Sequence, residues 1–216
     1  MSGNKRCGKC SLIYKGFIVL AAIVGILLQC GLGTGRFSFI SFRMFTTLSN
    51  LAVALFFIVY ITVNLASTGL SAKSSKALRY FKFLITMSIM LTGLVAHFML
   101  RGMFANMGVT AKVGLTLLHY VVPIATFLDW ILFDEKGKTE WKMPLFAALF
   151  PIIYVAISMI AAQFISGEDK YPYPFLNIDT LGIAMVLVNI LLLAVAFLAV
   201  GFIGVWADHK LSRKKT

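Results

Sequence analysis

Residues 18–28 read IVLAAIVGILL, a run that is apolar all round. A strand of a membrane β-barrel would alternate apolar and polar side chains over about 10 residues. A helix that crosses a bilayer instead needs roughly 20 predominantly apolar residues. Because residues 14–33 continue the run without alternation, they predict a transmembrane helix.

The whole chain has the composition of an integral membrane protein. Its 216 residues are 60% hydrophobic and 13% charged, with a mean hydropathy of +0.90, whereas soluble domains carry about 25% charged residues. No linker divides the chain, so we expect one all-α domain over residues 1–216. Six stretches are long enough to cross a bilayer: 14–33, 44–66, 82–100, 113–133, 143–165 and 180–206.

The basic residues predict how these helices are oriented. Lys and Arg in short loops stay on the cytoplasmic side of a membrane. Of the 20 Lys and Arg, fifteen lie in the N-terminal segment, the second and fourth loops and the C-terminal segment, and five lie in the other loops. Segments with many basic residues alternate along the chain with loops that have few, as six membrane crossings require. We therefore expect both termini in the cytoplasm.

The charge and the cysteines argue against other classes of protein. The net charge of +12 lies beside the spans, where it sets topology and attracts anionic headgroups, so we expect no nucleic-acid partner. Cys7 and Cys10 form a C-x-x-C pair. A structural zinc site usually has four ligands, and the chain has no second pair. We expect neither a metal nor a cofactor.

Polar side chains inside the spans indicate where chemistry is expected, because ionisable groups in a membrane are costly and face the bundle interior. At 1.5 Å per residue, Thr46, His97 and His119 all lie in the outer third of their spans. Asn50 follows Thr46 by four residues, on the same helix face. These positions predict a polar pocket near the outer leaflet, with the four side chains as its walls.

Thr46 and His119 are the candidate catalytic residues. A hydroxyl beside an imidazole is the minimum for nucleophilic acyl chemistry, because the imidazole takes the proton and the hydroxyl forms an acyl intermediate. Structural roles remain open, since threonines often pack between membrane helices and a buried histidine often bonds a carbonyl. Candidates for binding substrate or stabilising an oxyanion are Asn50, Asn189 and Arg101.

Two other ionisable residues have simpler interpretations. His97 either orients the base or packs against its neighbours. Two histidines are too few for a catalytic zinc site, which usually has three protein ligands. Asp129 precedes Trp130 near the cytoplasmic end of the fourth span, and we expect it to pair with Lys136 or Lys138.

The fifth loop, SGEDKYPYPFLNID (166–179), differs from the other loops because it contains two Tyr-Pro pairs. Proline restrains the backbone at its own position and at the residue before it. We therefore expect residues 167–179 to form an ordered lid over the polar pocket. An aromatic belt at the membrane interface explains the tyrosines equally well, but not the paired prolines.

Three stretches carry a resemblance to a known family: FRMFTTLSNLAVAL (42–55), LLHYVVPIATFLDWILF (117–133) and YPYPFLNIDTLG (171–182). The chain resembles the bacterial six-span membrane proteins related to the animal androgen-induced and androgen-dependent membrane proteins. These animal relatives are membrane threonine hydrolases that split fatty acid esters of hydroxy fatty acids, with one threonine and one histidine. The resemblance implies a location in a bacterial cell membrane and a lipid or fatty acid ester as substrate.

Carried over by motif, the nucleophile falls on Thr46 and the base on His119. The chain departs from the family pattern at Thr47, a second hydroxyl beside the first, and in a spacing from His119 to Pro123 that is one residue shorter. Two functions remain: a hydrolase of lipid esters, or a lipid-binding or transport protein that uses the same polar cluster without cleaving a bond. A transporter more often has broken helices and polar sites near the midplane, where only Asn189 lies.

The charge pattern makes a testable prediction about orientation. A single cysteine placed at Gly167 should react with a membrane-impermeant maleimide in intact cells, and one placed at Ser75 should be protected, because the basic loops remain inside. The reverse labelling pattern would show that the termini lie outside.

Overall fold

The structure, a computed structural model, describes residues 2–34, 37–66, 76–104, 107–167 and 169–213. Within these residues all the regular elements are helical. The long helices are α1 (Ser2–Gln29), α2 (Phe45–Leu65), α3 (Lys76–Val95), α4 (Val109–Thr116), α5 (Val122–Phe133), α6 (Met143–Ala161) and α7 (Ile178–Arg213). The short ones are η1 (Phe39–Arg43), η2 (Ala96–Leu100), η3 (Arg101–Phe104), η4 (Leu117–Val121) and η5 (Pro174–Leu176).

The predicted all-α architecture is confirmed, and it includes the six helices of membrane-spanning length that the sequence predicted. Among the described residues, six helical stretches are long and apolar enough to cross a bilayer, which indicates an integral membrane protein. η2 extends α3 into one span, and α4, η4 and α5 together form another. The six spans are Gly8–Gln29, Phe45–Leu65, Lys76–Leu100, Val109–Phe133, Met143–Ala161 and Ile178–Ser212.

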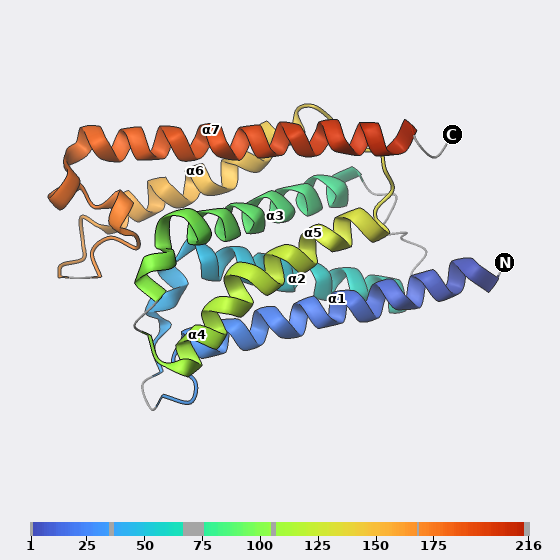
Figure 1. The fold of residues 1–216 in the computed structure, drawn as a ribbon, viewed down its shortest axis with the longest axis horizontal. Coiled ribbons are helices and arrows are strands. Elements are labelled where there is room, and N and C mark those ends of the chain that lie inside the picture. The colour runs from blue at the N-terminus through green and yellow to red at the C-terminus, as the bar shows by residue number, and fades with distance from the viewer. Residues whose placement is uncertain (1, 35–36, 67–75, 105–106, 168, 214–216) are drawn as a thin grey trace.

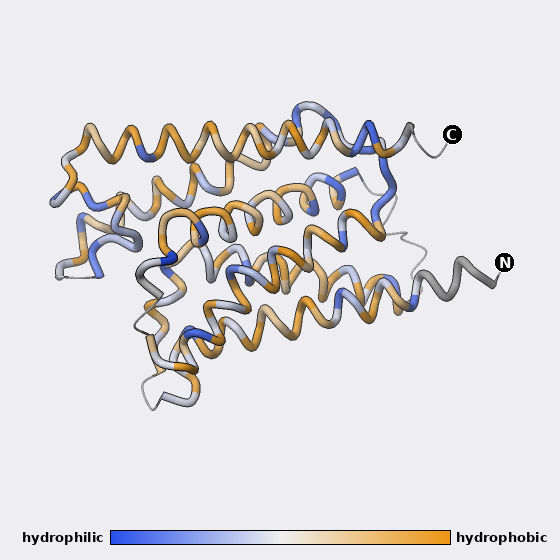
Figure 2. Tube along the Cα trace, viewed as in Figure 1, coloured by the Kyte–Doolittle hydropathy of each residue, from blue (hydrophilic) through white to orange (hydrophobic). Residues whose placement is uncertain are grey.

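The spans form an elongated bundle in which both termini lie at the same end (Figure 1). We call this the terminal end, and we call the opposite end, where η1 and η5 lie, the Thr46 end. Apolar residues dominate the lengths of the helices, whereas hydrophilic residues gather in the connections and near the helix ends (Figure 2). This distribution is the one expected for helices that meet lipid along their length.

The first helix ends four residues earlier than predicted, at Gln29. The N–H of Leu32 donates to the carbonyl of Leu27 (3.0 Å), and the N–H of Gly31 donates to that of Leu28 (3.1 Å). This pair of bonds closes a helix when the residue after its end has a positive φ. Gly31 supplies it, with φ 95°, and the chain then returns through η1 to α2.

α2 buries its first two turns and exposes much of its remaining length. The buried part contains most of the polar side chains of this helix, whereas Leu55, Val59 and Leu65 are more than half exposed. The polar beginning of α2 therefore lies inside the bundle, at the Thr46 end. Its buried residues are Phe45, Thr46, Thr47, Ser49, Asn50, Val53, Ala54 and Phe57.

A buried cluster of charges joins α1, α3 and α5 toward the terminal end. Lys15 Nζ lies 2.7 Å from Asp129 Oδ1, and Lys82 Nζ lies 2.6 Å from Asp129 Oδ2. Lys82 also pairs with Asp134. Asp129 is 0% exposed and Lys15 is 1% exposed. Two lysines and two aspartates thus balance one another, with Lys15 and Asp129 fully buried and Asp134 at the partly exposed edge of the cluster.

The prediction that Asp129 pairs with Lys136 or Lys138 is wrong. Lys136 donates instead to the carbonyl of Trp130, and the partners of Asp129 come from two other helices. Lys15 and Lys82 are among the fifteen basic residues assigned to the cytoplasmic segments from the sequence, yet both are buried in the structure. Helix periodicity defines the face on which Asp129 lies, but it does not reveal which helices pack on that face.

Asp129→Asn should lower the free energy of unfolding by about 3–5 kcal/mol, because removing one partner leaves buried charges uncompensated. Thermal unfolding of the purified protein in detergent would measure this. Asp179→Asn, which breaks an exposed pair with Lys170, is the matched control and should leave the transition temperature unchanged. Equal stability of the two variants would contradict a structural role for the cluster.

Candidate active site

The structure brings Thr46 and His119 into hydrogen-bond contact. Thr46 Oγ1, in the first turn of α2, lies 3.1 Å from His119 Nε2, in η4. Both residues are buried, with 4% and 3% of their surfaces exposed. A hydroxyl nucleophile and its base must lie within about 2.6–3.2 Å of each other. The two residues therefore satisfy the distance that acyl transfer requires.

The other nitrogen of His119 determines the tautomer of the neutral ring. Nδ1 lies 2.9 Å from the carbonyl oxygen of Leu115, which can only accept a hydrogen bond. Nδ1 therefore carries the proton in the neutral imidazole, and Nε2 is left as an acceptor toward Thr46 Oγ1. This is the tautomer that a general base needs.

A π-helical turn presents His119 to α2. η4 is such a turn inside the fourth span, and π-helical turns occur frequently at functional sites. Pro123 lies four residues after His119 and has no N–H to donate to the His119 carbonyl. On the facing helix, a Cβ added at Gly93 would lie only 3.0 Å from that carbonyl. Glycine at this position lets α3 pack closely against the irregular turn.

Tyr173, from the loop before α7, contacts Thr46 twice. The backbone N–H of Thr46 donates to the Tyr173 hydroxyl oxygen at 3.2 Å, and the two hydroxyl oxygens lie 3.3 Å apart. Because the Thr46 hydroxyl donates to His119, the Tyr173 hydroxyl is the donor to Thr46 Oγ1. Burial raises the pKa of Tyr173, partly opposed by its hydrogen bonds with Thr46. The phenol therefore keeps its proton at neutral pH.

Asn50 and Ser49 hold the backbone around Thr46. Asn50 Nδ2 donates to the carbonyls of Thr46 (2.8 Å) and Leu118 (3.2 Å), which ties α2 to η4. The Ser49 hydroxyl bonds the Thr46 carbonyl and lies 2.8 Å from Thr92 Oγ1 on α3. Asn50 was a candidate for stabilising an oxyanion, but its amide hydrogens are directed at these two carbonyls. These two bonds hold the Thr46 backbone against the turn that contains His119.

An apolar cavity of about 210 Å³ lies beside Thr46. α2, α3, α6, α7 and the Tyr173 loop form its walls, and Thr46 is one of its few polar residues. Its apolar lining includes Leu91, Val95, Pro151, Ile190 and Phe197. The cavity is therefore suited to a hydrocarbon chain whose polar end lies at Thr46.

The loop before α7 packs against the site, as the sequence predicted for a lid. Arg43 donates to the carbonyls of Asp169 and Lys170, and Tyr173 bonds Thr46. Asn189, another candidate for stabilising an oxyanion, donates to the carbonyl of Phe175 at 2.9 Å. The structure thus places Asn189 where it holds the lid, and away from the Thr46 hydroxyl. Glu168 lies outside the described residues.

His97 and Arg101 are not part of this hydrogen-bond network as the structure describes it. Both residues are exposed, and the His97 ring packs edge-on against Phe98 and Tyr120, with centroids 5.0 and 6.2 Å away. The sequence placed His97 at the correct end of the bundle, but its side chain lies on a different face of its helix from the one that meets Thr46. Packing is the observed role.

In the described part of the chain, no group of three or more His, Cys, Asp and Glu side chains could hold a metal ion. Cys10 and Cys30 are free, Cys10 exposed and Cys30 buried. The side chain of Cys7 lies outside what the structure describes. The arrangement at Thr46 is suited to acid–base and nucleophilic chemistry.

Tyr173 is a residue of the candidate site that the sequence did not single out. Its loop was expected to cover the site, but Tyr171 and Tyr173 have the same local context, each followed by proline. Tyr171 instead bonds Asp179 at 3.3 Å. Only the path of the folded loop distinguishes the tyrosine that reaches Thr46 from the one that stays at the surface.

Comparisons of the chain with protein-family models, with curated proteins and with solved structures found no match. The fold and the geometry of the site therefore carry the functional argument. The resemblance to the six-span threonine hydrolases stays a prediction.

Proposed function

We propose that this protein is an intramembrane hydrolase of lipid esters, with Thr46 as the nucleophile and His119 as the general base. The observation that carries the proposal is the 3.1 Å contact between Thr46 Oγ1 and His119 Nε2. The other ring nitrogen, Nδ1, donates to the carbonyl of Leu115, so Nε2 is the acceptor. Packing alone requires a threonine to fill space but does not require its hydroxyl to point at the unprotonated nitrogen of a buried imidazole.

The reaction proceeds in two halves. His119 Nε2 takes the Thr46 hydroxyl proton as Oγ1 attacks the ester carbonyl, and the alcohol leaves with that proton, so that an acyl-threonine remains. His119 then takes a proton from water, whose oxygen attacks the acyl carbon. The carboxylic acid leaves, and the proton returns to Thr46 Oγ1.

Tyr173 and the backbone N–H of Thr46 are the proposed donors to the oxyanion. An oxyanion site needs donors directed at the place where negative charge develops. The Thr46 N–H lies in the first turn of α2, where the helix dipole favours negative charge. In the structure this N–H donates to the Tyr173 hydroxyl. A substrate carbonyl oxygen that enters between the two groups accepts from both.

The apolar cavity defines the class of substrate. It is lined by Thr46 and Tyr173 at the reactive end and by apolar side chains beyond them. A long-chain acyl group fits these walls with its carbonyl at Thr46, as in fatty acid esters of hydroxy fatty acids, the substrates that the family resemblance implies. The charge pattern favours a position of the Thr46 end at the outer leaflet of a cell membrane.

Replacing the nucleophile or the base tests the proposal. Thr46→Ala and His119→Ala should each lower ester turnover by more than about 10³-fold, and the double variant should be little worse than either, because the pair acts as a unit. Purified protein would be assayed with branched fatty acid esters and simple acyl esters, and labelled with a fluorophosphonate that captures activated hydroxyls.

Thr47→Ala is the matched control for this experiment. Thr47 is fully buried, and its hydroxyl has no hydrogen-bond partner in the described structure, so its loss should leave most of the activity. Wild-type hydrolysis and labelling by Thr46→Ala would refute the assignment. If the wild type neither hydrolysed any lipid ester nor took the label, the lipid-binding or transport interpretation would replace it.

Tyr173→Phe tests the oxyanion donor separately. The change removes one hydroxyl and keeps the ring, which stacks on Phe175 with centroids 5.0 Å apart. Loss of one oxyanion donor costs about 10²–10³-fold in kcat, so kcat should fall by this amount while KM changes little. Fluorophosphonate labelling of Thr46 should persist at a lower rate. A rise in KM with unchanged kcat would indicate a lid that only retains substrate.

A further inference from the structure

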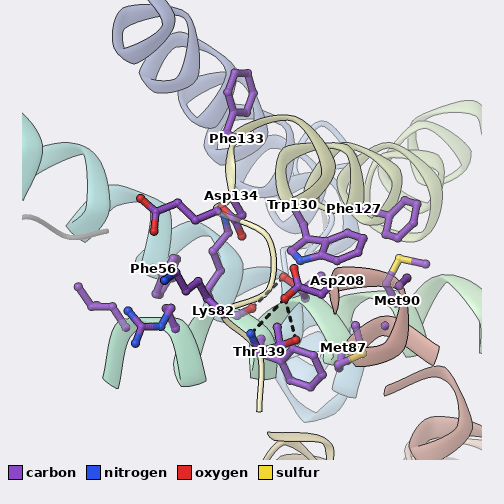
Figure 3. A pocket seen from close by; sticks show the side chains of 18 of the residues that line it. Phe56, Lys82, Met87, Met90, Phe127, Trp130, Phe133, Asp134, Thr139 and Asp208 are labelled. Carbon is purple, nitrogen blue, oxygen red and sulfur yellow. Dashed lines mark hydrogen bonds and ion pairs between the residues drawn. The ribbon is translucent and has the colours of Figure 1, made fainter. Parts of the chain in front are cut away.

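A second cavity lies at the terminal end of the bundle, away from Thr46. Its volume is about 310 Å³, and it lies between α3, α5 and α7 beside the connection from α5 to α6. Met87, Met90 and Phe127 lie together on one part of its wall (Figure 3). The wall toward the terminal end carries charges of both signs, on Arg79, Lys82, Asp134, Glu135, Lys138 and Asp208. The part beside the two methionines is apolar and suited to hydrocarbon.

One face of α3 and one face of α7 line both cavities. On α7, Ile190 and Phe197 line the cavity beside Thr46, and Gly204 lines the second. These residues are spaced by seven, about two helical turns, so they lie on one face. On α3, Leu91 lines the cavity beside Thr46, and Met87, four residues earlier on the same face, lines the second. The two cavities are therefore two stretches of one path between α3 and α7.

A layer of buried apolar side chains separates the two stretches. Phe197 lines the cavity beside Thr46, whereas Phe83 and Met87 line the second, and all three belong to one buried cluster. Methionine is unbranched and flexible, and it adapts to irregular gaps. Met87 also faces a glycine, since a Cβ added at Gly204 would lie 3.8 Å from Met87 Cε. Met87 therefore has open volume beside it into which its side chain can move.

Only the two stretches together have the length of a long acyl chain. The α7 residues that line the cavity beside Thr46 run from Ile190 to Leu198, eight residues or about 12 Å at 1.5 Å per residue. From Ile190 to Gly204 the distance along α7 is fourteen residues, or about 21 Å. An extended hydrocarbon advances about 1.3 Å per carbon, given a C–C bond of about 1.5 Å, so these lengths hold about nine and about sixteen carbons.

We propose that the acyl chain of the ester runs from Thr46 through the cavity beside it, past Phe197 and Met87, and ends in the apolar part of the second cavity. The second cavity is then the binding site for the distal part of a long chain, and a short chain leaves it unfilled. This inference rests on the proposed function for the position of the ester carbonyl. It concerns where the chain lies, and not whether the ester is cleaved.

Fluorescence quenching locates the end of the chain. Trp141 and Trp206 are replaced by Phe, so that Trp130, which lines the second cavity, is the remaining tryptophan. Thr46→Ala is added so that the ester is not consumed. The full chain, in phosphatidylcholine vesicles, is titrated with methyl esters brominated on the last carbon. The hexadecanoyl ester should quench Trp130 saturably. The octanoyl ester should quench only in proportion to its partitioning into the membrane, because its chain ends before the second cavity.

A variant that fills the second cavity tests the same path. Gly204→Leu should abolish the saturable quenching. In the chain that keeps Thr46 and its tryptophans, it should lower kcat/KM for the hexadecanoyl ester about tenfold or more, equivalent to about 1.4 kcal/mol, and leave the octanoyl ester nearly unchanged. Gly16→Leu is the matched control, because a Cβ added at Gly16 on α1 meets no atom within 4 Å. It should behave as the parent chain with both esters.

Two outcomes would overturn the proposal. One is the absence of saturable quenching by the hexadecanoyl ester, which would place the end of the chain in the surrounding lipid. The other is unchanged quenching in a folded Gly204→Leu protein. The comparison of chain lengths needs no variant of the cavity, so it decides even if Gly204→Leu does not fold. Saturable, length-dependent quenching by a protein whose Thr46 form cleaves no ester would support the path of the chain and refute the hydrolysis alone.

Discussion

Lipid offers no hydrogen bonds, so each polar group inside a membrane protein must find its partner within the protein. In the described part of the chain, two groups of buried polar side chains meet this constraint at opposite ends of the bundle. Asp129 binds Lys15 and Lys82 toward the terminal end, and Thr46 meets His119 and Tyr173 at the other. Each group joins three segments that are distant in sequence. These polar contacts specify how the helices align along their lengths, which contacts between apolar faces alone specify poorly.

The two groups differ in what their chemistry allows. In the charge cluster, the two lysines and two aspartates balance one another, an arrangement that stabilises helix packing without leaving a reactive group. At Thr46 the hydrogen bonds run in one direction, from Tyr173 through Thr46 to His119 and on to the Leu115 carbonyl. That chain ends in a fixed acceptor, so the proton of the Thr46 hydroxyl already lies toward the base.

Most of the fold follows from the sequence. An apolar run that is long enough to cross a bilayer and does not alternate with polar residues satisfies its backbone hydrogen bonds in lipid by forming a helix. Thr46 and His119 were also predictable, since few polar residues lie inside the spans and these two lie at similar depth. Tyr173 and the lysine partners of Asp129 were not. Depth along a helix follows from residue count, whereas the direction a side chain faces depends on which helices pack beside it. His97 illustrates the difference, because its depth was right and its face was wrong.

The irregular turn at His119 links the packing of the bundle to the proposed chemistry. The Leu115 carbonyl, one turn before His119, accepts the hydrogen bond from Nδ1 of the ring. The π-helical turn, the missing N–H of Pro123 and the absent side chain at Gly93 shape the backbone that carries His119 against α3. The bond to Leu115 sets the tautomer of the imidazole, and the packing of the turn sets which atom faces Thr46.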